Sequence, residues 1–206
     1  MGVFNHAEFD NHESLHYFHD EKSGLKAIVA VHSTALGPAA GGTRRWVYNN
    51  DADALTDVLR LSRGMTYKNA VAGLKFGGGK AVILASADTP KSPEQFRAFG
   101  RFVDSLGGKY VTAEDVGCSV EDMRIVHEET EFVSGLPQTG HDAGGDPSPW
   151  TALGCYQGIE AAVHARLGAD SLQGIKVAVQ GAGHVGLHLC RMLHEAGAEL
   201  FVSDVN

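Results

Sequence analysis

The sequence has few cysteines, no long apolar run and a shortage of basic residues. Its three cysteines, Cys118, Cys155 and Cys190, are far apart and form no Cys-x-x-Cys pair. This usage favours free thiols in a reducing cytoplasm over a disulfide framework or a zinc site. The apolar stretches fall far short of the roughly 20 residues that cross a bilayer, and the N-terminus does not resemble a signal peptide. We therefore expect a cytoplasmic protein with no membrane span and no metal site.

The charge balance is acidic, with 17 Lys and Arg against 25 Asp and Glu and a formal net charge of -8. Nucleic-acid binding needs a concentrated basic face, so we expect no nucleic-acid partner and, more weakly, no binding to anionic membranes. Net charge does not exclude a small basic pocket. At 206 residues and 43% apolar, the chain can form one substantial domain, or one domain and part of another.

Strand and helix signals alternate along the chain, which predicts an α/β fold. Strands are expected at 26–34, 81–85, 109–113, 176–180 and 200–204, and helices at 51–69, 92–106, from Ser119, at 148–168 and at 185–195. A Gly/Pro loop is expected at 36–43. A second loop at 141–149 is the best domain boundary, which predicts domains at 1–147 and 148–206. The second domain looks cut short, since one β-α-β unit cannot cover both faces of its strands.

A dinucleotide-binding turn is predicted between the last two expected strands. The G-x-G-x-x-G consists of Gly181, Ala182, Gly183, His184, Val185 and Gly186. It follows a strand and opens a helix, whose N-terminus offers free N–H groups to a pyrophosphate. Asp204 ends the next strand, where an acid binds ribose hydroxyls and favours NAD over NADP. The alternative is a glycine turn and a strand-end acid that bind no ligand.

Two lysines and an aspartate are candidates for chemistry on an anionic small molecule. Lys68 lies near the end of an expected helix, and Lys80 follows three glycines just before a strand. One lysine can bind a carboxylate, while the other can act as a base if burial and a neighbouring cation lower its pKa. Asp115 lies at the carboxyl end of an expected strand, where it could exchange protons with an amine. Solvated lysines and a turn acid are equally compatible with the spacing.

A histidine group near the N-terminus invites a metal-site interpretation. His12, His16 and His19 have the spacing of one helix face, with Glu13 among them. The order is not that of His-Glu-x-x-His, and the region is polar. We interpret these residues as a solvated helix face.

Several stretches together resemble the Glu/Leu/Phe/Val dehydrogenase family, and most of all its leucine dehydrogenase branch. They are LGPAAGGTR, LSRGMTYKNAVAGLKFGGGKAVI, KYVTAEDVG, PSPWTALGCYQGIEAA and VAVQGAGHVGLHLC followed by LFVSDVN. They span most of residues 30–206 in family order, and GMTYKNAVAGLKFGGGKAVI is highly specific. The resemblance implies an N-terminal substrate domain of the dimerisation type, then a linker helix and the start of a Rossmann NAD-binding domain.

The resemblance also implies a reaction and a set of roles. The reaction is NAD-dependent oxidative deamination of an L-amino acid to a 2-oxo acid and ammonia. The implied catalytic residues are Lys80, which activates water, and Asp115, which moves protons to and from nitrogen. The implied substrate-binding residues are Lys68, Gly41, Gly42 and Met65. Thr151 is implied to lie near the nicotinamide. Family members are homo-oligomers, so a homo-oligomer is expected.

Two departures from the family pattern keep alternatives open. The nucleotide domain of the family continues beyond its second strand, so a truncated, inactive amino-acid-binding module is one alternative. Ala40 stands where the leucine enzymes carry a larger apolar residue, so leucine is not separated from valine, isoleucine or phenylalanine. Glutamate dehydrogenase is the nearest enzymatic rival, but Ala40 and Ala113 supply no cation for a side-chain carboxylate.

Overall fold

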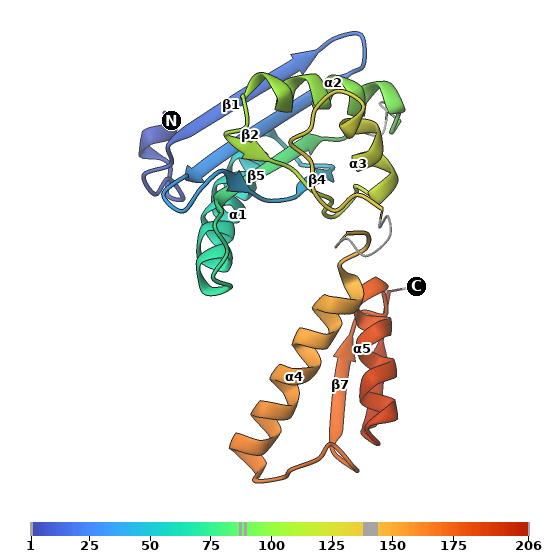
Figure 1. The fold of residues 1–206 in the computed structure, drawn as a ribbon. Helices are drawn as coiled ribbons and strands as arrows, with labels where there is room; N and C mark the ends of the chain where they lie inside the picture. The colour runs from blue at the N-terminus through green and yellow to red at the C-terminus, as the bar shows by residue number, and fades with distance from the viewer. Residues whose placement is uncertain (1, 87, 89, 138–143, 206) are drawn as a thin grey trace. The chain divides into compact units, whose positions relative to one another are not determined.

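The structure is a computed structural model that describes residues 2–86, 88, 90–137 and 144–205. Part of the loop expected at 141–149 therefore lies outside the described residues. The chain divides into two compact units, residues 1–145 and 146–206, here called unit 1 and unit 2 (Figure 1). Each unit is described by itself.

Unit 1 is built on a six-stranded mixed sheet. Its strands are β1 (Ser14–Asp20), β2 (Leu25–Ser33), β3 (Ala39–Ala40), β4 (Thr43–Trp46), β5 (Gly77–Leu84) and β6 (Tyr110–Val111). The order is β1-β2-β5-β3-β6, and β4 also pairs with β5. The pairs β1–β2 and β2–β5 are antiparallel, whereas β3 and β4 run parallel to β5. The expected α/β class is confirmed.

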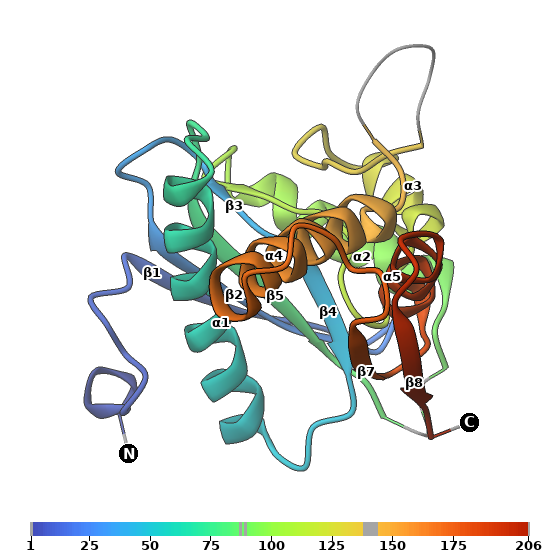
Figure 2. The ribbon, with the colours of Figure 1, turned by 90° about the horizontal axis from the view of Figure 1, so that it is seen from below.

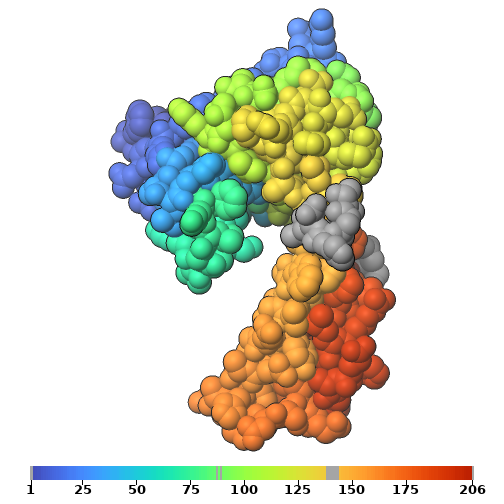
Figure 3. All heavy atoms as spheres, in the orientation of Figure 1, coloured from blue at the N-terminus to red at the C-terminus, as the bar shows by residue number. Residues whose placement is uncertain are grey.

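Helices cover both faces of this sheet. They are α1 (Asp51–Val71), α2 (Pro93–Ser105) and α3 (Val120–His127). α1 runs across β2 and β5 on one face, while α2 and α3 lie on the other (Figures 1 and 2). In the space-filling view α1, coloured teal, forms the lower surface of unit 1 (Figure 3).

Alternation along β2 separates the two cores. Ala27, Val29 and Val31 belong to the cluster that contains Phe96 and Phe99 of α2. The intervening residues Ile28 and Ala30 pack with Ala54 and Val58 of α1. Each fully buried Phe contributes about 1.5–3 kcal/mol through apolar burial. The central strands are therefore apolar on both sides, as a sheet covered on both faces requires.

Local capping signals set the starts of two helices. The Ser92 side chain accepts from the backbone N–H of Gln95, and Pro93 occupies the first helical position. Ser119 caps α3 in a reciprocal arrangement with Asp122. Both helix starts predicted from the sequence are confirmed. The Gln95 side chain instead accepts from Nε of Arg45, at 3.0 Å.

Three sequence expectations are wrong in unit 1. Residues 14–20 form strand β1, so the three N-terminal histidines do not share a helix face, and His12 is buried. The loop expected at 36–43 contains β3 and the start of β4. β5 begins at Gly77, which places Lys80 inside a strand rather than before one. In each case pairing with other strands overrides the local pattern.

Unit 2 contains one β-α-β unit preceded by a long helix. Its elements are α4 (Ser148–Leu167), β7 (Lys176–Gln180), α5 (His184–Glu195) and β8 (Glu199–Ser203). β7 and β8 are parallel, and Val177 and Val179 pack with Leu189 and Leu193 of α5. α4 is capped at its C-terminus by Gly168, whose left-handed conformation suits glycine. The elements expected in this region are confirmed.

Candidate active site

Lys80 is a buried lysine that points to a carboxylate. The residue is 5% exposed within β5, and its Nζ lies 2.9 Å from Oδ2 of Asp115. Burial lowers the pKa of Lys80 from its ordinary value; Asp115 opposes this change and Arg44 adds to it. A lysine with a lowered pKa is more often neutral near physiological pH, which is the state that a general base requires.

Asp115 follows β6 and is held by two cations. Its Oδ2 accepts from Nζ of Lys80 and also, at 3.0 Å, from Nε of Arg44. Burial acts to raise the pKa of Asp115, but Lys80 and Arg44 outweigh it and hold this pKa below its ordinary value. Asp115 is therefore an ionised carboxylate at neutral pH, able to accept a proton or orient a donor.

Sequence reasoning missed Arg44, its partner Asp57, and Tyr48, which donates to Asp57. Arg44 lies on β4, and its Nη1 donates to Oδ2 of Asp57 on α1 at 2.9 Å. The Tyr48 hydroxyl donates to the same Asp57 oxygen at 2.7 Å. A neighbouring cation that lowers the pKa of the lysine base was expected from the sequence, and in the structure Arg44 is a cation with this effect on Lys80. The GGTR stretch held the signal for Arg44, whereas nothing local indicated Asp57.

The predicted glycines lie in close backbone contact with the strands that carry the catalytic candidates. A Cβ on Gly41 would lie 1.9 Å from the carbonyl oxygen of Gly79 and 3.0 Å from Cγ of Met65. A Cβ on Gly42 would lie 2.4 Å from the Glu114 carbonyl oxygen. A side chain at either position would clash with its neighbours. The structure thus brings Gly41, Gly42 and Met65 close to β5 and to the segment before Asp115.

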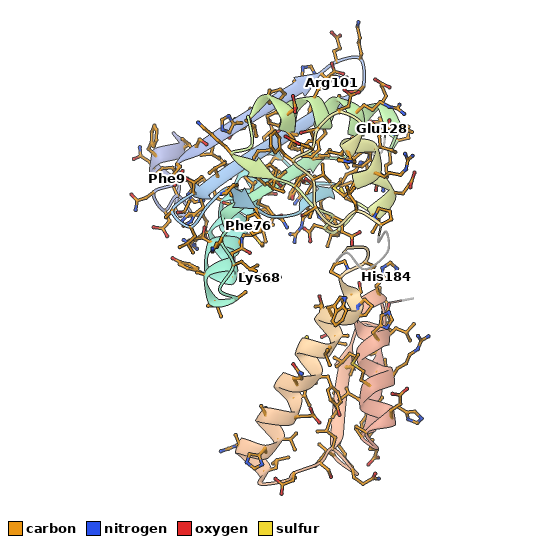
Figure 4. The ribbon with its side chains drawn as sticks, viewed as in Figure 1. Phe9, Lys68, Phe76, Arg101, Glu128 and His184 are labelled. Carbon is orange, nitrogen blue, oxygen red and sulfur yellow. The ribbon has the colours of Figure 1, made fainter. Side chains whose placement is uncertain are left out.

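Lys68 is placed differently from Lys80. It lies in the last turn of α1, three residues after Met65, and its side chain is exposed (Figure 4). Residues three apart on a helix are neighbours on its surface. An exposed ammonium in this position can meet an incoming anion, whereas the buried Lys80 is shielded from solvent.

The glycine turn of unit 2 has the shape that a pyrophosphate needs. Gly181 has a positive φ of 98°, and a Cβ on Gly186 would lie 2.0 Å from the Gly181 carbonyl oxygen. α5 begins at His184, which Figure 4 shows at the start of the helix, and its N-cap is Gly183, which has no side chain to cap the helix. The first-turn N–H groups therefore suit an anionic ligand, and these residues fit the phosphates of a dinucleotide.

Two further cofactor candidates also lie in unit 2. Asp204 follows β8, and its Oδ2 accepts from the Ala182 N–H at 2.6 Å, so the acid lies beside the turn. Thr151 lies exposed in the first turn of α4 and donates to the Pro147 carbonyl at 3.0 Å. The cofactor candidates thus share unit 2, while the catalytic and substrate candidates share unit 1.

Among residues 2–86, 88, 90–137 and 144–205, no group of three or more His, Cys, Asp or Glu is placed to hold a metal ion. In the same residues, no helix combines the length and apolarity needed to cross a bilayer.

Comparison with known proteins identifies the family of the chain. Residues 12–132 match the sequence profile of the Glu/Leu/Phe/Val dehydrogenase dimerisation domain. The chain belongs to the Glu/Leu/Phe/Val dehydrogenase family. All the residues with predicted catalytic and substrate-binding roles lie within the matched range, so the profile covers the whole of this part of the site.

Individual relatives include several amino-acid dehydrogenases of the family. The chain is 55% identical to leucine dehydrogenase of Bacillus subtilis (strain 168), covering 100% of this chain and 56% of that protein. It is 50% identical to valine dehydrogenase of Streptomyces virginiae, and the match covers 97% of this chain and 56% of that protein. The crystal structure of L-tryptophan dehydrogenase from Nostoc punctiforme matches with a TM-score of 0.69 and 48% identity. This match covers 95% of this chain and 54% of that one. The chain thus spans about half the length of the curated relatives that it matches.

Proposed function

We propose that the protein containing this chain is an NAD-dependent amino-acid dehydrogenase, which deaminates an apolar L-amino acid to its 2-oxo acid and ammonia. The observation that carries the proposal is the 2.9 Å contact of buried Lys80 with Asp115, in a member of this family. A proton acceptor and a carboxylate are thereby held together beside a glycine-lined surface. This is the pairing that proton transfer at an amine carbon requires.

In this proposal, unit 1 binds the amino acid. The exposed ammonium of Lys68 would attract the substrate carboxylate, and the backbone at Gly41 and Gly42 would assist, as the family resemblance implies. Ala40, which precedes them at the end of β3, leaves room for an apolar side chain. We assign the substrate to the apolar class, without choosing between leucine and its larger or smaller analogues.

The proposed proton transfers are carried out by Lys80 and Asp115. Once hydride has left the α-carbon, neutral Lys80 would take a proton from water as that water adds to the carbon of the resulting C=N bond, and ammonia would then leave from the same carbon to give the 2-oxo acid. Asp115 exchanges protons with the amino group and receives hydrogen bonds from Lys80 and Arg44 throughout. Because Lys80 is buried, its proton is exchanged with Asp115 or with reacting groups rather than freely with solvent.

Unit 2 is proposed to hold the NAD cofactor, which supplies hydride acceptance when bound. The turn from Gly181 to Gly186 would bind the phosphates, Asp204 the ribose, and Thr151 would lie near the nicotinamide. Support comes from the free first-turn N–H groups of α5 and from the acid held next to the turn. The homo-oligomeric state expected from the family belongs to this proposal as well.

A direct test measures NADH formation with a panel of L-amino acids. The 206-residue chain is compared with a version extended to the length of the relatives, and with its Lys80→Ala variant. The proposal expects activity in the extended protein with apolar amino acids, loss of activity in the variant, and none in the 206-residue chain. Amino-acid binding by the extended protein without NADH formation would indicate a binding module, and a preference for glutamate would overturn the apolar assignment.

A further inference from the structure

Two cations share one oxygen of Asp115. Oδ2 lies 2.9 Å from Nζ of Lys80 and 3.0 Å from Nε of Arg44. A carboxylate oxygen has two lone pairs, so it can accept both hydrogen bonds at once. The two donors come from different strands, Lys80 from β5 and Arg44 from β4. The negative charge of Asp115 is therefore divided between them.

Arg44 is itself held on its far side. Its Nη1 donates to both carboxylate oxygens of Asp57, at 2.9 and 3.3 Å, so the guanidinium bridges Asp57 and Asp115. The Tyr48 hydroxyl donates to Asp57 at 2.7 Å. Burial, with the Asp57 hydrogen bond and charge, raises the pKa of Tyr48, so this hydroxyl keeps its proton and remains a donor at alkaline pH. A planar fork of this kind can engage two carboxylates, which a lysine ammonium cannot do in the same way.

We propose that Arg44, held by Asp57, which in turn accepts a hydrogen bond from Tyr48, is the positioning residue for the Lys80–Asp115 pair: it orients the Asp115 carboxylate and partly neutralises the negative charge that Asp115 presents to Lys80. This inference rests on the proposed function, because it gives Arg44 a purpose in the chemistry of that pair. It goes beyond that function by assigning a role to three residues that lie outside the predicted catalytic set.

The charges facing Lys80 decide the direction of the effect. They come from Asp115 after β6, Arg44 on β4 and Asp57 on α1. Without Arg44, Lys80 faces two carboxylates uncompensated by that cation, and its protonated form becomes more stable. Without the charge of Asp57, the field at Lys80 becomes more positive, and its neutral form becomes more stable.

The test is a pH titration of the Lys80 side chain in the isotopically labelled 206-residue chain. Its ¹³Cε and ¹⁵Nζ shifts are followed by NMR and assigned by their loss in Lys80→Gln. For Arg44→Gln we expect the neutral fraction of Lys80 at a given pH to fall about tenfold, one pH unit of displacement. For Asp57→Asn we expect a change in the opposite direction. Arg45→Gln is the matched control, since it removes the same charge from the next residue of β4, which donates to Gln95.

Each outcome has a defined meaning. An Arg44→Gln titration that matches both the parent and Arg45→Gln would overturn the proposal, as would changes of the same sign in Arg44→Gln and Asp57→Asn. If Arg44→Gln does not fold, Arg44→Lys serves instead: it keeps the charge but not the bridge, so Asp115 should lose its fixed orientation while Lys80 titrates closer to the parent. An Asp115 ¹³Cγ signal unchanged in Arg44→Lys would then refute the positioning role.

A second readout separates this inference from the proposed function. In the extended protein, Arg44→Gln should move the acidic limb of the kcat/KM pH profile to higher pH, and Arg45→Gln should leave it in place. The Lys80 titration needs no turnover. Absence of dehydrogenase activity would therefore overturn the proposed function while leaving the titration result to decide the role of Arg44.

Discussion

The Tyr110 hydroxyl donates a 2.6 Å hydrogen bond to the carbonyl oxygen of Gly41. Tyr110 is fully buried in the core between the sheet and α2, whereas Gly41 belongs to the predicted substrate surface. Burial raises the pKa of Tyr110, so the phenol stays protonated and remains a donor throughout the physiological range. The core of unit 1 thus fixes the backbone conformation of a predicted substrate-binding residue.

We expect Tyr110→Phe to lower the free energy of unfolding by about 1–3 kcal/mol, because it leaves a buried carbonyl without this donor. Denaturant unfolding of the 206-residue chain measures the change. Tyr17→Phe is the control: Tyr17 lies on β1 and is 60% exposed, so its hydroxyl is open to water. Equal stability of Tyr110→Phe and Tyr17→Phe would contradict the importance of the hydrogen bond.

A second prediction concerns the contact of α1 with β5. A Cβ on Gly78 would lie 2.0 Å from Oγ1 and 2.2 Å from the backbone N of Thr66. We expect Gly78→Ala to lower the free energy of unfolding by about 3 kcal/mol or more, because the backbone of α1 would have to shift to make room for the Cβ. Thermal or denaturant unfolding provides the measurement.

Gly64 offers a matched control for Gly78→Ala. It lies inside α1, and a Cβ there would meet nothing within 4 Å. Gly64→Ala should therefore stabilise the chain by about 0.5–1 kcal/mol through helix propensity. A Gly78→Ala as stable as the parent would show that the packing of α1 on β5 is looser than the structure has it, and a destabilised Gly64→Ala would show that the space around Gly64 is not open.

The helices of this fold were predictable because their signals are local. Ser92 with Pro93, and Ser119 with Asp122, begin helices through contacts within a few residues. β3 and β4 were not predictable, since strands of two and four residues exist through their pairing with β5. The helix expected for the N-terminal histidines was wrong for the same reason. Their spacing fits a helix, but pairing with β2 makes residues 14–20 a strand.

The site was predictable in part, for a related reason. Lys80 and Asp115 could be named because they lie in stretches that resemble the family. Arg44 and Asp115 are 71 residues apart, and no periodicity or spacing joins them. Asp57 looks like one more solvated acid of α1, and its contact with Arg44 appears when the strand and helix are packed. Contacts such as Arg44 with Asp57 form only when distant segments pack together, so the sequence alone does not reveal them.

The pH dependence of the proposed activity has a definite sign. In the proposed mechanism neutral Lys80 is the active form, so kcat/KM should rise with pH as Lys80 loses its proton. Burial lowers the Lys80 pKa, so this rise in kcat/KM should occur at lower pH than for an ordinary lysine.

In the extended protein, Lys80→Ala should reduce kcat by about 10²–10⁴-fold while NAD affinity, measured by fluorescence titration, stays within about twofold. A weakened NAD affinity with unchanged kcat would contradict the assigned role.

Asp115 also links pH to stability. Its pKa is lowered on folding, so its contribution is fully present above the unfolded value and is lost as pH falls through the folded one. Asp115→Asn leaves Lys80 and Arg44 without their shared carboxylate, and we expect a cost of about 2–3 kcal/mol at neutral pH. Measured against pH, the difference from the parent should stay constant above about pH 5 and narrow below about pH 4. A constant difference down to pH 2 (roughly) would show that the Asp115 charge does not stabilise the fold.

The contact of Asp204 with Ala182 leads to a prediction about cofactor choice. The Asp204 carboxylate is held 2.6 Å from the Ala182 N–H, which fixes a negative charge beside the turn. A 2′-phosphate brought to this place would meet that charge at close range. In the extended protein, Asp204→Asn should keep an acceptor for the Ala182 N–H and raise the NADP/NAD ratio of kcat/KM by about tenfold, the effect of removing about 1.4 kcal/mol of repulsion. Ser203→Ala, one residue earlier, is the control. If both variants retained the parent ratio, the charge of Asp204 would have no part in selecting the cofactor.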